Sequence, residues 1–267
     1  MPLIHTDLEK VPDLSAHDSL MKEAGPQIVK EGSKRGLHLR LLGAIAFQYH
    51  CPKYNYITAK LRRQLSDVDF AGYNSERKVI DNMMREFGYS DQPMVSALFG
   101  HQRMIWDNKS NGLHVDIFFD KLEMNHDIPF VGRLELDETT IPLVDMLLEK
   151  MQIVHINEKD IVDTIMLLRE HTVGNGVAPE TIDTSYMKKL LSNDLGFYYT
   201  VTTNLKNVED RLNLYPELTQ EDKADVSKKI QQLQSELQAA PKTLAWKLRA
   251  RMGNKSKWYK DVEDVNR

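Results

Sequence analysis

A single cysteine, Cys51, is present in this chain of 267 residues, so no disulfide can form within the molecule. The sequence has no apolar run near the roughly 18 residues that a transmembrane helix requires. Its first residues lack the basic start and the apolar segment of a secretory signal. Charged residues make up 28% of the chain, as in soluble proteins. These absences predict a cytoplasmic protein that does not enter a membrane, with Cys51 as a passive thiol.

Several common cofactor and metal motifs are missing as well. The absence of a Walker A motif and of a dinucleotide-binding glycine fingerprint argues against a P-loop NTPase and a Rossmann dehydrogenase. His101, His114 and His126 do not have the spacing of a zinc site. No internal repeat or low-complexity segment is visible, and the length suits one or two domains with a substantial core.

The most informative stretch that is present is Ser66-Asp67-Val68-Asp69-Phe70. In a strand, residues two apart point to the same face, so Asp67 and Asp69 would project together while Val68 and Phe70 face a core. Two like charges side by side destabilise the fold unless a cation or a hydrogen-bond network compensates them. A hard divalent ion such as Mg²⁺ is the natural compensator. The pattern alone is weak, because most acid pairs of this spacing are solvated.

A third carboxylate, Asp116, lies in the most strand-like run of the chain, 113–119. A second strand-like run, 102–106, precedes it, and the connection between them ends in Asn-Gly, so the two runs are predicted to form a β-hairpin. Asp116 would share its face with His114, which could then contact a substrate. A carboxylate in such a strand needs a partner. Alone it could pair with a Lys or Arg, but together with Asp67 and Asp69 a shared metal site is the better interpretation.

Periodicity and turn residues predict an α+β fold, with a small mixed β-sheet flanked by helices and a largely helical C-terminal half. We expect a helical lead-in over 14–33 interrupted at Gly25-Pro26, a strand over 37–42, and a tight turn at Gly43 into a helix over 44–49. A helix over 75–87 with Ser75 as its N-cap and a further strand over 132–136 follow. The chain is predicted to divide into a core of residues 1–140 and a helical domain of residues 141–267.

The turn and the three aspartates resemble the signature of the nucleotidyltransferases with the DNA polymerase β type fold. That signature is a Gly-Gly or Gly-Ser turn after a strand, an Asp-x-Asp strand and a lone Asp on a later strand. The matching residues here are Gly43, Asp67, Asp69 and Asp116. Within the superfamily the chain is most similar to the AbiEii-type toxins and their relatives, over roughly residues 38 to 168.

The narrower resemblance adds candidate residues. The AbiEii-type relatives have an Arg a few residues before the first Asp, and Arg63 takes that place here. They also have a Lys on a helix, followed by a Lys/Arg-Asp-x-x-Asp segment. Lys150 matches that Lys, and Asp160 matches the first Asp of the segment. The resemblance implies that Lys150 neutralises phosphate, and that Asp160 orients Lys150 or binds base or acceptor. The second turn residue departs from the pattern: Ala44 lacks the hydroxyl of the usual Ser. Ser66 or backbone N–H groups would then hold the terminal phosphate.

This resemblance implies an enzyme that uses Mg²⁺ (or Mn²⁺) to move a nucleoside monophosphate from an NTP to a hydroxyl. Asp67, Asp69 and Asp116 would hold the metal, with Asp116 accepting the hydroxyl proton. The acceptor could be RNA (such as a tRNA 3′ end), a small molecule or a protein. Two other hypotheses stay open: a non-catalytic nucleotide-binding module that retained the fold, and a toxin controlled by a separately encoded antitoxin.

The C-terminal tail interleaves basic and aromatic residues from Lys242 to Lys260, including Trp246, Trp258 and Tyr259. Such a pattern can bind nucleic acid through phosphate contacts and base stacking. It is equally typical of a solvated tail helix. The formal net charge of −4 gives nucleic-acid binding no independent support.

Overall fold

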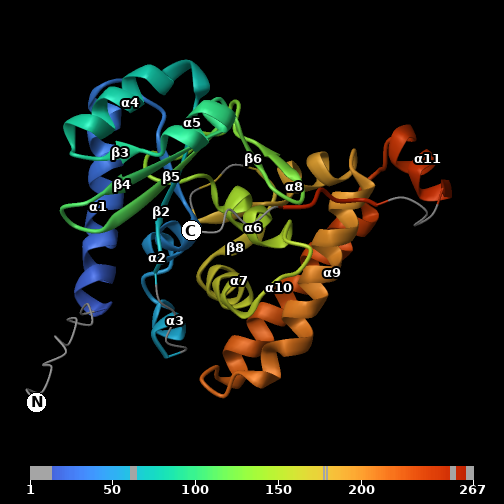
Figure 1. Ribbon diagram of the computed structural model, residues 1–267. Helices are drawn as coiled ribbons and strands as arrows, with labels where there is room; N and C mark the ends of the chain where they lie inside the picture. Colours follow the sequence, from blue (N-terminus) through green and yellow to red (C-terminus); the bar gives the residue numbers. More distant parts are fainter. Residues whose placement is uncertain (1–13, 61–64, 177, 179, 253–256, 263–267) are drawn as a thin grey trace, which may run out of the picture.

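The computed structural model of the chain describes residues 14–60, 65–176, 178, 180–252 and 257–262. A β-sheet with its helices forms one part of the molecule, and the helices that follow residue 142 form the other (Figure 1). This arrangement confirms the predicted α+β class. None of the described helices combines the length and the apolar character that crossing a membrane requires.

The central sheet has five strands in the order β1-β2-β5-β4-β3. Its middle pair, β2 (Val68–Gly72) and β5 (Leu113–Phe119), is parallel, whereas every other neighbour is antiparallel. The predicted hairpin is β4 (Arg103–Asn108) followed by β5. The remaining strands are β1 (Arg40–Leu42) and the short β3 (Ser90–Asp91). The sheet is therefore mixed and small, as expected.

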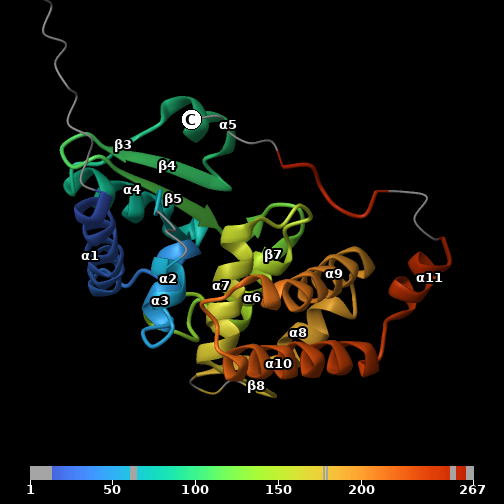
Figure 2. The same cartoon turned by 90° about the horizontal axis from the view of Figure 1, so that it is seen from below.

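The two faces of the sheet differ because side chains alternate along each strand. Val68, Phe70, Val115 and Ile117 are fully buried on one face. Helices α1 (Leu14–Lys34) and α4 (Arg77–Glu86) lie beside the sheet (Figure 2). The other face carries Asp69 and Asp116 and is turned toward the C-terminal half. One face thus supplies the core and the other is left for chemistry.

The helical lead-in is not interrupted at Gly25-Pro26 as predicted, since α1 continues through Pro26. A proline inside a helix removes one backbone hydrogen bond. Packing of α1 against β1 compensates for this loss. The two are so close that a Cβ at Gly25 would lie 3.0 Å from Cδ2 of Leu41. The glycine allows α1 to approach β1 closely, and this tertiary contact outweighs the local helix-breaking signal.

Two further expectations are corrected. Ser75 lies in a 3₁₀ turn over Asn74–Glu76, and α4 begins only at Arg77, so Ser75 does not cap it. The prediction of a strand over 132–136 is wrong, because these residues form turns. Gly132 has a φ of +72° there. The actual pairing there joins β6 (Lys121–Glu123) to β7 (Asp127–Pro129). In addition to α4, three short helices lie between the strands of the sheet in sequence: α2 (Gly43–His50), α3 (Tyr56–Lys60) and α5 (Pro93–Phe99).

The C-terminal half is helical except for one parallel pair, β8 (Thr172–Gly174) with β9 (Thr181–Asp183). Its helices are α6 (Leu143–Met151), α7 (Glu158–Glu170), α8 (Thr184–Leu191), α9 (Leu195–Arg211), α10 (Gln220–Ala239) and α11 (Leu244–Met252). Both α6 and α7 contact α2, so the two halves pack together through the helix that starts at Gly43. The predicted domain division near residue 140 stays a prediction.

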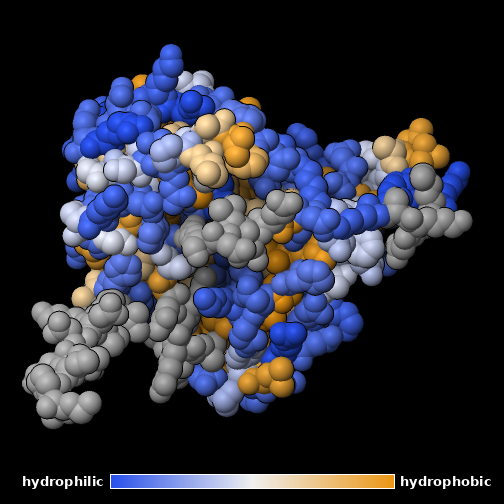
Figure 3. Space-filling view, viewed as in Figure 1, coloured by the Kyte–Doolittle hydropathy of each residue, from blue (hydrophilic) through white to orange (hydrophobic). Residues whose placement is uncertain are grey.

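Exposed apolar side chains gather on α5 and at the far end of the molecule on α11 (Figure 3). Leu244 and Leu248 of α11 are at least half exposed, whereas Trp246 packs edge-on against Tyr198 of α9. The basic and aromatic tail is therefore partly packed onto the helical half and partly open to solvent.

Candidate functional site

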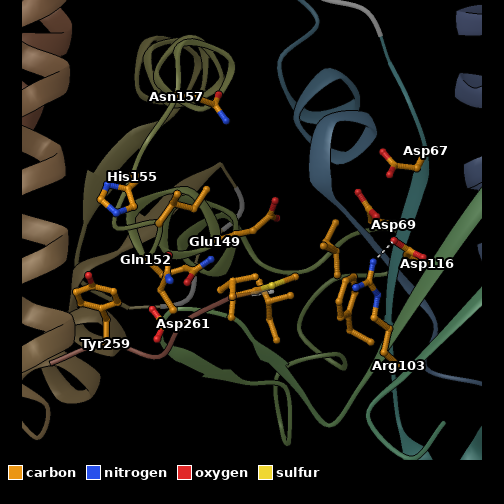
Figure 4. A pocket seen from close by; sticks show the side chains of 17 residues that line it. Asp67, Asp69, Arg103, Asp116, Glu149, Gln152, His155, Asn157, Tyr259 and Asp261 are labelled. Atoms are coloured by element: carbon orange, nitrogen blue, oxygen red, sulfur yellow. Dashed lines mark hydrogen bonds and ion pairs between the residues drawn. The ribbon is translucent and has the colours of Figure 1, made fainter. Parts of the chain in front are cut away.

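The structure brings the three predicted aspartates together at the middle of the sheet. Asp69 on β2 lies opposite Asp116 on β5 in the parallel register, and Asp67 comes one residue before β2. Each of the three offers a carboxylate oxygen, and these oxygens lie within 4.8 Å of one another (Figure 4). Oxygen ligands at this spacing suit a hard divalent cation.

Gly43 makes this cluster possible, because it follows Leu42, the β1 residue paired with Asp69. Its φ is +69°, a conformation that glycine adopts easily. A Cβ at this position would lie 2.3 Å from Oδ2 of Asp69, so no other residue fits without displacing the carboxylate. The backbone N–H of Gly43 donates to Oε2 of Glu149, at 3.1 Å. The turn therefore connects the sheet carboxylates to α6.

The electrostatics of Asp69 show that the cluster has an excess of negative charge. Burial raises the pKa of Asp69 well above its ordinary value, and the neighbouring carboxylates of Asp67, Asp116 and Glu149 raise it further. Lys150 acts in the opposite direction but does not cancel the shift in this pKa. The attraction of a bound cation would offset both the repulsion and the burial cost.

Asp116 is 2% exposed, and its Oδ2 accepts a hydrogen bond from the Arg103 guanidinium at 2.6 Å. Arg103 also lies over the ring of Phe118, with its guanidinium carbon 5.0 Å from the ring centroid. The sequence argument missed Arg103. The hairpin pattern held the signal, since Arg103 pairs with Phe118 and lies diagonal to Asp116 on the same face.

Ser66, Ala44 and Arg63 are the other residues that the sequence predicted to bind the nucleotide. The exposed Ser66 donates its hydroxyl to Oδ1 of Asp67, so in this state it serves the cluster itself. Ala44 is half-buried in the first turn of α2. Arg63 lies outside the described residues.

Lys150 and Asp160 come together on α6 and α7, near enough to the sheet for the charge of Lys150 to act on Asp69. The Lys150 ammonium lies 3.0 Å from Glu149, 3.5 Å from Asp160 and 3.5 Å from Asp163, and it is 6% exposed. This position agrees with the predicted contact between Asp160 and Lys150. A direct role of Lys150 at a phosphate stays a prediction, and Glu149 and Asp163 are partners that the sequence argument did not identify.

The three aspartates line a pocket of about 600 Å³ between the sheet and the C-terminal half (Figure 4). Arg103, Phe118 and Leu42 complete the wall on the sheet side. The far wall comes from the turn between β6 and β7, from the connection between α6 and α7, and from residues 257–262, which we call the C-terminal strap. The residues that line this far wall include Asn125, Gln152, Ile153, His155, Asn157, Tyr259, Asp261 and Val262.

Comparisons with known proteins give only a weak structural likeness. No protein-family model matches the chain, and no curated protein matches it. A crystal structure of an antigenic nucleotidyltransferase-like protein from Paracoccidioides brasiliensis is similar at 13% identity, with a TM-score of 0.36. The match covers 84% of this chain and 95% of that chain. A TM-score this low transfers neither fold nor function, so the function has to be argued from the site.

Proposed function

We propose that this protein is a metal-dependent nucleotidyltransferase that moves a nucleoside monophosphate from an NTP to a hydroxyl. The observation that carries the proposal is the cluster of Asp67, Asp69 and Asp116 on two parallel strands at the base of a pocket. The Gly43 turn against Asp69 supports it, because turn and cluster are the elements of the resemblance to nucleotidyltransferases.

Asp67, Asp69 and Asp116 are the residues that would hold Mg²⁺ or Mn²⁺. The ions would supply charge neutralisation for the triphosphate and a lowered pKa for the acceptor hydroxyl. The raised pKa of Asp69 is consistent with this fit, since it reflects first the burial of the carboxylate and then its repulsion by neighbouring carboxylates. The set is made entirely of oxygen donors, which matches the preference of these ions.

The side chains of the pocket then have distinct tasks. Asp116 accepts the proton of the acceptor hydroxyl. The hydroxyl oxygen forms a bond to the α-phosphorus while the bond to the bridging oxygen breaks, and pyrophosphate leaves with that electron pair. Arg103 holds the Asp116 carboxylate in place and adds a positive charge beside the reacting phosphate. Lys150 supports the Asp69 carboxylate through its field.

The resemblance to AbiEii-type toxins supports a narrower form of the proposal, in which a separately encoded antitoxin controls the enzyme. The genes beside this one provide a direct test. An adjacent small gene whose product binds the protein and blocks transfer is the expected finding. Transfer that proceeds unaffected by every neighbouring gene product would contradict the narrower form.

The decisive experiment incubates the protein with each labelled NTP, Mg²⁺ and, in separate reactions, total RNA, small-molecule extract and protein extract. We expect label from at least one NTP to enter one acceptor fraction, with release of pyrophosphate. Asp67→Asn should abolish the transfer. Asp210→Asn is the matched control, because Asp210 forms an exposed pair with Lys206 on α9, outside the pocket. Label transfer by Asp67→Asn at the wild-type rate would contradict the proposal.

A further inference from the structure

The C-terminal strap is held against the rest of the molecule by specific contacts. The Lys260 N–H donates to the Asn125 carbonyl at 3.0 Å, and the Asn125 side-chain amide donates to the Lys260 carbonyl at 2.8 Å. The Lys260 ammonium pairs with Glu123 at 2.6 Å and Asp127 at 2.7 Å. The strap is thus fixed to the β6–β7 hairpin. In Figure 2 the strap is drawn as a red trace, separate from α11.

Trp258 anchors the other end of the strap on α9. The Trp258 backbone lies so close to Gly196 that a Cβ there would be 2.3 Å from the Trp258 carbonyl oxygen. The Tyr199 ring packs edge-on against Trp258, with centroids 5.2 Å apart. Gly196 therefore has a packing role, because it provides the space in which the strap lies.

Asn125 connects the strap to the rest of the far wall. Its side-chain oxygen accepts a hydrogen bond from Val154 N–H at 2.9 Å, while its amide nitrogen holds the Lys260 carbonyl. One side chain therefore joins the strap to the α6–α7 connection that carries His155. Tyr259 and His155 both lie on the side of the pocket away from the three aspartates (Figure 4).

The chemistry of the two walls differs. Among the described lining residues, the single Lys or Arg is Arg103, which lies on the sheet side. The far wall contains the acidic Asp261 and the rings of His155 and Tyr259. Phosphates are disfavoured beside Asp261 without a cation, whereas a flat nucleobase suits aromatic rings. A nucleotide whose phosphates lie at the metal-binding cluster would therefore have its base at the far wall.

We propose that the C-terminal strap forms the nucleobase subsite and that Tyr259 contacts the base of the bound NTP. The inference rests on the proposed function, because it takes the phosphates to lie at Asp67, Asp69 and Asp116. Tyr259 is then a base-binding residue that is remote in sequence from the sheet. The docked strap completes the substrate pocket.

The test compares the binding of two ligands, an NTP and inorganic tripolyphosphate. Each is titrated calorimetrically into the full-length protein in the presence of Mn²⁺. Tripolyphosphate offers the phosphates without the base. We expect Tyr259→Ala to weaken NTP binding about tenfold, the loss of one base–aromatic contact, and to leave tripolyphosphate affinity unchanged. Tyr259→Phe keeps the ring and should bind NTP like the wild type. Tyr49→Ala, an exposed tyrosine on α2 outside this pocket, is the matched control.

A second variant displaces the strap without altering a pocket residue. Gly196→Ala places a Cβ against the Trp258 carbonyl, and we expect the same selective loss of NTP affinity. Equal NTP affinity in Tyr259→Ala and wild type would overturn the inference, as would an equal loss for both ligands. The proposed function fails in a different way: wild-type protein would then bind neither NTP nor tripolyphosphate with Mn²⁺, and the inference would fall with it.

Discussion

Two groups of three carboxylates are compensated in different ways in this molecule. Glu149, Asp160 and Asp163 surround Lys150, whose ammonium lies within 3.5 Å of an oxygen of each. Asp67, Asp69 and Asp116 gather at the pocket, where Arg103 pairs with Asp116. The pKa of Asp69 nevertheless remains raised, first by burial and then by its carboxylate neighbours.

The difference lies in where each cation is placed. The Lys150 ammonium contacts all three of its carboxylates, so folding itself brings a cation to each of them. In the pocket cluster Arg103 pairs with Asp116, and the pKa of Asp69 stays raised by burial and by the neighbouring carboxylates. We therefore expect the first cluster to depend on its own lysine for stability, and the second to gain stability from a cation taken from solution.

The largest expected effect comes from making the same substitution in both clusters. Asp69→Asn should lower transfer by about three orders of magnitude, because a metal ligand is lost. Its free energy of unfolding should stay the same or rise, since one of several like charges is removed. Asp163→Asn should instead lower the free energy of unfolding. Urea unfolding and initial rates measured on both variants check this, and a destabilised Asp69→Asn would remove the distinction between the clusters.

The next effect is measured on stability. Lys150→Met removes the cation from a buried group of carboxylates, which should cost about 3–5 kcal/mol of the free energy of unfolding. Lys206→Met is the control, because Lys206 forms an exposed pair with Asp210 on α9. Chemical denaturation of both variants gives the comparison. A loss of stability no greater than that of the control would show that Lys150 is not needed to balance its neighbours.

The sheet and its carboxylate face could be predicted because their signals are local. Strand periodicity places Asp69 and Asp116 on one face, and the Asn-Gly turn identifies the hairpin. The same hairpin register would also have placed Arg103 beside Asp116. These features depend on residues close in sequence or on neighbouring strands.

Features that depend on long-range packing could not be predicted. The strap contact between Asn125 and Lys260 joins residues 135 apart in the chain, and no local pattern indicates it. The enclosure of Lys150 requires α6 and α7 to pack at one particular angle. Pro26 is a second example of a feature that local sequence does not predict. The local sequence would end the helix there, but the contact of α1 with Leu41 preserves it.

A smaller effect should appear in the pH dependence of stability without metal. The folded-state pKa of Asp69 is raised above its unfolded value, so the charged form is disfavoured by folding. This penalty is fully present above the folded-state pKa and fades as the pH falls from there toward the unfolded-state pKa, because the carboxyl group is then protonated in both states. Asp69→Asn resembles the protonated form at every pH. Its stability advantage over the wild type should therefore shrink on acidification.

Urea unfolding of both proteins at a series of pH values, with and without Mg²⁺, measures this difference. Added Mg²⁺ should stabilise the wild type near neutral pH and have little effect on Asp69→Asn, because ligand binding to the folded state raises stability. A stability difference that does not change with pH would show that Asp69 is not the repelled carboxylate of the cluster.

The smallest expected effect extends the comparison to ion pairs at the surface. Lys260 holds the strap through Glu123 and Asp127, but its side chain is 50% exposed, so solvent and salt weaken both pairs. Lys260→Ala should loosen the strap and weaken NTP binding by only about two- to fivefold at low salt. High salt screens the ion pairs of Lys260 in the wild type. The NTP affinities of the wild type and of Lys260→Ala should therefore converge as the salt concentration rises. Titrations at several salt concentrations, with Lys206→Ala as the control, measure the convergence. An NTP affinity of Lys260→Ala equal to that of the wild type at low salt would show that the backbone contacts to Asn125 hold the strap without the ion pairs.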